Sequence, residues 1–203
     1  QFYERKVNKG MNESKTSFKL KGVESVKVSE QSNIADLIFE GGVQGRITFL
    51  EENIFRYDVD PAGEFEAYAT PRDEAHTAKI QQRPDESSEY TKPEVQVLWK
   101  DDTFSVLCGE TSVTWDKHTG RMSVYVHGRP VMEEMKTLII EDGETIQTLK
   151  KQPGEDFFGG GTQNGRFVHT GKKIRIVNES AWMDGGVASP NPFYYTTNGY
   201  GVV

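Results

Sequence analysis

Apolar and polar residues alternate with a period of two along much of the chain. The alternation occurs in residues 23–28, 47–50, 54–59, 95–99, 104–108, 112–115, 122–127 and 137–140. Successive side chains of a strand point to opposite faces, so this pattern predicts strands with one buried face. Turn-forming residues at 51–53, 60–63, 101–102, 117–120 and 141–143 separate them. Together they predict a two-sheet antiparallel β-sandwich, an all-β fold with little helix.

No long apolar stripe of helical period is present. The best helical candidate, residues 131–138, is short and follows Pro130 directly, so we expect one or two turns of helix at most. We expect residues 1–203 to form a single domain. Residues 70–93 are polar and contain three prolines, which predicts a long surface connection, with an interaction loop as the alternative.

Charge and composition exclude several classes of partner. The net charge is −7, whereas nucleic acid and anionic membranes require clustered Lys and Arg, so a neutral partner fits better. The chain has 11 Phe, 8 Tyr and 3 Trp, which argues against disorder. Its single cysteine, Cys108, lies in an apolar stretch and is interpreted as a core residue.

No apolar run approaches the roughly 20 residues that span a bilayer, and the first residues contain no apolar signal region. We therefore expect a soluble protein, in the cytoplasm rather than secreted, although a signal peptide could have preceded residue 1. The sequons at Asn12 and Asn178 are too common by chance to indicate secretion. The sequence stops inside an expected strand at Val203, so we expect the natural chain to continue.

The composition changes after Pro153, where Gly, Asn and aromatic residues become frequent. The run of residues 157–161 (FFGGG) lacks the spacing of a phosphate-binding loop. Its glycines are interpreted as positions of positive φ or close backbone approach, with Phe157 and Phe158 anchored in the core. The same glycine turn could also bring a loop close to a ligand.

Other chemical motifs are weak. The four histidines have no metal-ligand spacing and no GxSxG motif occurs, so we expect neither a metal nor a cofactor. His127 and His169 are interpreted as hydrogen-bonded structural residues. Four carboxylates lie in the unusual segment: Glu155, Asp156, Glu179 and Asp184. They are weak as a catalytic pair. Asp184 is more suitable as a contact to a sugar, because a carboxylate accepts strong hydrogen bonds from vicinal hydroxyls, and Trp182 nearby could stack on the apolar face of a pyranose. A core position is the alternative for Trp182.

Three stretches resemble the N-terminal domain of glycoside hydrolase family 31, which includes α-glucosidases and α-xylosidases. They are residues 47–65 (ITFLEENIFRYDVDPAGEF), residues 104–124 (FSVLCGETSVTWDKHTGRMSV), and a set formed by 157–167 (FFGGGTQNGRF), 181–186 (AWMDGG) and 191–203 (NPFYYTTNGYGVV). The last set resembles the family's Gly-rich segment, Asp-Gly-Gly-like element and closing strand pair. Thr162-Gln163 and Met183 depart from the common pattern, which affects the expected substrate rather than the fold.

The resemblance implies a galactose-mutarotase-like sandwich that packs on a (β/α)₈ barrel following residue 203. In the family the barrel supplies an Asp nucleophile and an Asp acid/base for a retaining mechanism, so we expect no catalytic residue in this chain. Residues 157–192 would form a loop toward the barrel, with Asp184 and Trp182 as contacts to an α-linked oligosaccharide or glycoside. Barrel-facing aromatic surface is expected around Phe193, Tyr194 and Tyr195.

Two other functions are compatible with the sequence. A stand-alone carbohydrate-binding module would need a complete sugar platform on this chain. A mutarotase-like enzyme would need a histidine and a carboxylate that converge on the concave sheet.

Overall fold

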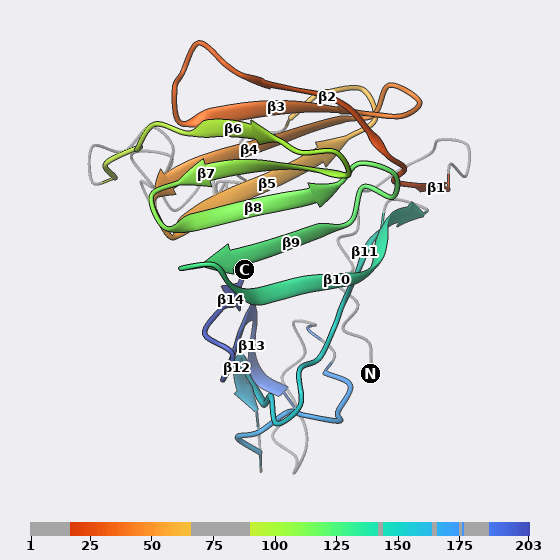
Figure 1. Ribbon diagram of the computed structural model, residues 1–203. Coiled ribbons are helices and arrows are strands. Elements are labelled where there is room, and N and C mark those ends of the chain that lie inside the picture. The colour runs from red at the N-terminus through yellow and green to blue at the C-terminus, as the bar shows by residue number, and fades with distance from the viewer. Residues whose placement is uncertain (1–16, 66–89, 142–143, 164–165, 175, 177–186) are drawn as a thin grey trace, which may run out of the picture.

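The computed structural model describes residues 17–65, 90–141, 144–163, 166–174, 176 and 187–203, and these residues form strands, turns and loops without a helix (Figure 1). The described part therefore contains no helix that could span a membrane. The expected all-β fold of the galactose-mutarotase-like sandwich type is confirmed.

Two antiparallel sheets form the sandwich. The four-stranded sheet has the order β2 (Val23–Val28), β3 (Ile34–Phe39), β4 (Gln44–Glu51) and β5 (Ile54–Asp60). The seven-stranded sheet has the order β1 (Phe18–Lys19), β10 (Arg129–Glu141), β9 (Met122–Val126), β8 (Thr111–Asp116), β7 (Thr103–Cys108) and β6 (Gln96–Trp99), and β11 (Glu144–Leu149) also pairs with β10. Consecutive strands are mostly neighbours because short turns connect them.

The hydrophobic core lies between these two sheets. Its largest fully buried side chains are those of Trp115, Phe39, Phe49, Phe104, Leu37 and Ile47. Phe104 and Trp115 stack with ring centroids 5.2 Å apart, across the β7–β8 pair. Cys108 is buried in the same core, which confirms its interpretation as a core residue.

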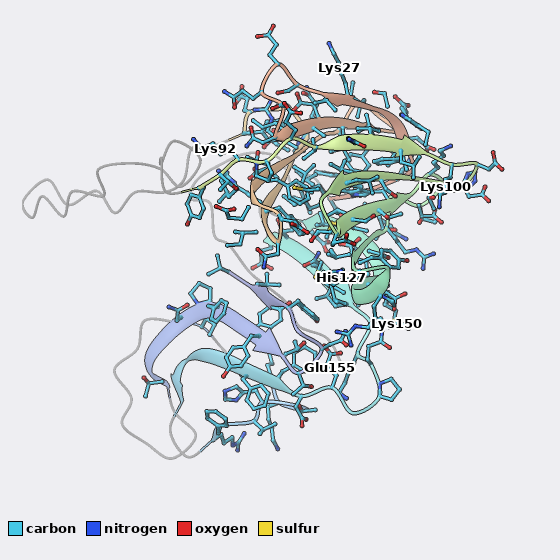
Figure 2. All side chains as sticks on the ribbon, turned by 60° about the vertical axis from the view of Figure 1, so that its left-hand side comes forward. Lys27, Lys92, Lys100, His127, Lys150 and Glu155 are labelled. Atoms are coloured by element: carbon cyan, nitrogen blue, oxygen red, sulfur yellow. The ribbon has the colours of Figure 1, made fainter. Side chains whose placement is uncertain are left out.

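The outer face of the four-stranded sheet carries a row of alternating charges. Lys27, Asp36, Arg46 and Asp58 lie opposite one another on four successive strands. Arg46 Nε donates to Asp36 Oδ1 over 2.7 Å, and Lys27 extends from the surface in Figure 2. Opposite charges that face each other across strands are mildly stabilising, and they indicate a face exposed to solvent.

The expected helix at residues 131–138 is wrong, because this segment belongs to β10. β10 has register shifts against β9 and against β11. Each bulge moves the strand's buried face by one residue, so adjacent pairs such as Val131–Met132 and Thr137–Leu138 are buried together. Pairs of buried residues at this spacing imitate the apolar pattern of a helix.

A third, small sheet has the order β12 (Phe157–Gln163), β13 (Val187–Thr196) and β14 (Gly201–Val202). It lies below the sandwich in Figure 1, and β11 runs from β10 toward it. Asn198 Nδ2 in the β13–β14 turn donates to the Val131 carbonyl over 2.5 Å. Tyr200 and Val202 pack against the sandwich core. These contacts attach the small sheet to β10.

Candidate functional site

The pairing of β12 with β13 positions the segment that the sequence indicates as functional. Gln163 at the end of β12 lies opposite Val187 at the start of β13, so both ends of residues 164–186 are held together by the ladder. Trp182 and Asp184 lie outside the described residues, so their role as sugar contacts stays a prediction. The two ends of the expected loop at residues 157–192 are strand, in β12 and in the first part of β13.

The glycine run allows β12 to approach β13 closely. Gly159, Gly160 and Gly161 all have positive φ, as expected from the sequence. A Cβ added to Gly159 would lie 2.5 Å from the Phe193 carbonyl oxygen and 2.8 Å from Tyr194 Cα. Only a glycine fits between these backbone atoms. The expectation that Phe157 and Phe158 anchor in the core is wrong, because both are half-buried on the small sheet.

One side of the small sheet carries four aromatic rings, of Phe158, Phe167, Phe193 and Tyr195, which we call the outer aromatic face. Phe158 stacks on Tyr195 with centroids 5.3 Å apart, and Phe193 stacks on Tyr195 at 5.9 Å. Phe167 contacts Phe158 at 5.3 Å. Phe167 is 74% exposed, and Phe193 and Tyr195 are each 42% exposed. The rings thus form one continuous apolar surface open to solvent.

The opposite side of the small sheet faces the sandwich. Tyr194 is buried there, between Phe157 and the edge of the Tyr200 ring. Burial raises the pKa of the Tyr200 hydroxyl, and the neighbouring Tyr194 and Glu155 raise it further, so Tyr200 stays protonated at neutral pH. The expected exposed surface is therefore right for Phe193 and Tyr195 and wrong for Tyr194, because neighbouring residues of a strand point to opposite faces.

Hydrogen bonds fix the segment after Phe167 to the start of β12. Thr170 Oγ1 donates to Asp156 Oδ1 over 2.7 Å and accepts from the Phe157 amide over 3.1 Å. The buried His169 donates its backbone amide to the Phe157 carbonyl. Glu155 is also buried, and its Oε2 accepts from the Gln152 amide. In Figure 2 Glu155 lies at the junction between the small sheet and the sandwich, below Lys150.

The outer aromatic face offers an apolar surface for binding. Aromatic rings can pack on another apolar surface or on the apolar face of a sugar ring. His118 and His127 lie in exposed turns, near Asp102 and Glu110 respectively. Within the described ranges, no group of three His, Cys, Asp or Glu side chains could hold a metal ion.

Comparison with known protein families gives the decisive observation. The sequence model described as the glycosyl hydrolase 31 N-terminal galactose mutarotase-like domain matches residues 44–203. The chain belongs to this family. The match includes the glycine run and the three strands of the small sheet, so these features belong to the glycosyl hydrolase 31 N-terminal domain itself. A comparison with curated protein sequences gave no match.

Solved structures of family 31 enzymes share the fold of this N-terminal domain. A dextranase of Flavobacterium johnsoniae, complexed with glucose, aligns with a TM-score of 0.71 at 13% identity over 91% of this chain. The cycloalternan-forming enzyme of Listeria monocytogenes, in complex with a pentasaccharide substrate, aligns at 0.66, with 16% identity over 92% of the chain. An α-xylosidase of Xanthomonas citri aligns at 0.57, with 16% identity over 89%. The chain covers 22%, 17% and 18% of these proteins respectively.

Proposed function

We propose that this chain is the non-catalytic N-terminal domain of a retaining α-glycoside hydrolase, hydrolytic or transglycosylating. A (β/α)₈ barrel in the longer protein would supply the catalytic aspartates. The family match supports this assignment, and so do the larger enzymes that share the fold over part of their length. The substrate class would be an α-linked oligosaccharide or glycoside.

The outer aromatic face is the observation that carries the proposal. Three of its rings lie side by side and are 42–74% exposed, and an isolated domain gains nothing from leaving them in water, because burying the exposed part of each would contribute up to about 1.5–3 kcal/mol. We propose that this face packs on the catalytic barrel. The outer face of the four-stranded sheet carries ion pairs such as Arg46–Asp36, which suit solvent rather than a domain interface.

The segment between β12 and β13 would then reach the barrel's sugar site. It begins and ends on the small sheet that carries the outer aromatic face, so docking of that face would bring the segment to the barrel. We propose that Asp184 accepts hydrogen bonds from sugar hydroxyls and that Trp182 packs on the ring.

The first experiment compares the parent enzyme with this chain alone on a panel of aryl α-glycosides. Asp184→Ala in the parent should lower kcat/KM by roughly 10-fold to 100-fold, the value of one charged hydrogen bond. The matched control is Asp102→Ala, which removes an exposed carboxylate in the β6–β7 turn. Turnover by this chain alone, or an equal effect of both substitutions, would contradict the proposal.

A second experiment tests the docking face. Phe193→Ser should weaken the binding of this chain to the separately expressed remainder of the parent, whereas Leu98→Ser should not. Both side chains are 42% exposed, and Leu98 lies on β6 of the sandwich. If this chain alone binds α-glucans with measurable affinity and Phe193→Ser abolishes that affinity, a carbohydrate-binding module becomes the better assignment.

A further inference from the structure

Strand β10 changes partners at Glu134. Its first residues, Arg129 to Glu133, pair with β9, and the remainder from Glu134 onward pairs with β11. The register shifts between Glu134 and Lys136, directly at this point. Glu134 therefore lies where the sheet divides, opposite Leu149 at the end of β11, and the chain continues from there toward the small sheet (Figure 1).

The Glu134 side chain joins the strands that separate there. It is 5% exposed. Its Oε2 accepts from the Met122 backbone amide of β9 over 2.9 Å, and its Oε1 accepts from Gln147 Nε2 of β11 over 2.9 Å. One carboxylate thus accepts the Met122 amide of β9 and also fixes the Gln147 side chain of β11.

The surroundings hold little compensating charge. Burial raises the pKa of the Glu134 carboxyl to about 7, against the opposing effects of the two hydrogen bonds and of Arg121 before β9. From β5, Tyr57 faces the same carboxyl, and burial together with this carboxylate keeps Tyr57 protonated. The neutral Gln147 faces it from β11. The adjacent Glu133 bonds instead with Lys150 and Gln152.

We propose that Glu134 and Gln147 form a proton-operated latch that holds β11 on β10. In the ionised state Gln147 donates to the carboxylate. In the protonated state the Gln147 amide turns over, so that Glu134 donates its proton to Gln147 Oε1 while Met122 N still donates to Oε2. Both states satisfy every partner, but only the ionised state has a charge removed from water.

The sign of the effect follows from the direction of the shift. The pKa of Glu134 is higher in the folded chain than its ordinary value of 4.5, so its neutral form is favoured by folding. The stabilisation is complete below pH 4.5 and is lost as the pH rises to about 7 and beyond. A shift of this size corresponds to a change of up to about 300-fold in the folding equilibrium.

The test combines a direct titration with a matched pair of variants. The carboxyl ¹³C signal of Glu134 should titrate with a midpoint near 7. Between pH 4.5 and 8, protection of the β10 and β11 amides, corrected for intrinsic exchange, should fall by up to about 300-fold. Glu134→Gln should remove most of this fall, and Glu133→Gln should leave it unchanged. A midpoint near 4.5 in the unmodified chain, or an undiminished fall in Glu134→Gln, would overturn the proposal.

Discussion

Replacing Gly159 with alanine tests whether backbone contact holds the small sheet together. Gly159 has a φ of +109° on β12, a conformation that costs an L-residue about 1–2 kcal/mol. Its new Cβ would also lie within 2.5 Å of the Phe193 oxygen, and backbone atoms cannot rotate away as a side chain does. Overpacking of this kind adds about 1–3 kcal/mol. The expected loss of stability is therefore about 2–5 kcal/mol.

Gly199→Ala is the matched control. Gly199 lies in the turn after β13 with a φ of +91°, and a Cβ there would meet nothing within 4 Å. This variant carries only the conformational cost of about 1–2 kcal/mol. Amide hydrogen exchange of β12 and β13 measures both variants, and tyrosine near-UV circular dichroism follows the stacking of Phe158 on Tyr195. Equal losses of stability in the two variants would refute the argument that the backbones of β12 and β13 are too close to accommodate a Cβ at residue 159.

Two further predictions concern the sandwich. Burial, with added effects of Glu52 and Glu51, raises the pKa of the Cys108 thiol, so a disulfide reagent should label it only in denaturant; rapid labelling of the native chain would contradict its placement. Burial acts to raise the pKa of Asp116, but hydrogen bonds from Thr119 and His118 outweigh it and lower the pKa, so this stabilisation should be lost as the pH falls below about 3.8. Asp116→Ala should cost about 1–2 kcal/mol in urea unfolding and remove that pH dependence.

Much of the sandwich could be predicted because strands with one buried face show an alternation of apolar and polar residues in the sequence. Residues 112–115 alternate in the sequence and also in the structure, within β8. Within the sandwich the predictions missed β1, β3 and β11. In β3 alternate residues are buried, but the sequence IADLIF does not alternate because the outward-facing Ile34 and Ile38 are also apolar. In β11, five of the six side chains are half-buried, so no apolar period marks the strand.

Less of the candidate site could be predicted, because it depends on pairings between distant residues. The motif at 191–203 predicted the strand pair of β13 and β14, which the structure confirms. The outer aromatic face also requires Phe158, which lies opposite Tyr195, and Phe167, which reaches it from the segment after β12. Spacing along the chain contains no information on either contact. Trp182 and Asp184 stay predictions.

The Gln163–Val187 pairing also has a consequence for how such enzymes diversify. It sets a constant separation between the two ends of residues 164–186, independent of what lies between them. Phe167 and Thr170 also fix the first part of this segment to β12, so a segment exchanged at these two points must keep those contacts to leave the ladder unaltered. Within this family, we therefore expect specificity to change by replacement of an insert on a fixed frame. A segment transplanted from a relative should leave the β12–β13 pairing intact if it retains Phe167 and Thr170.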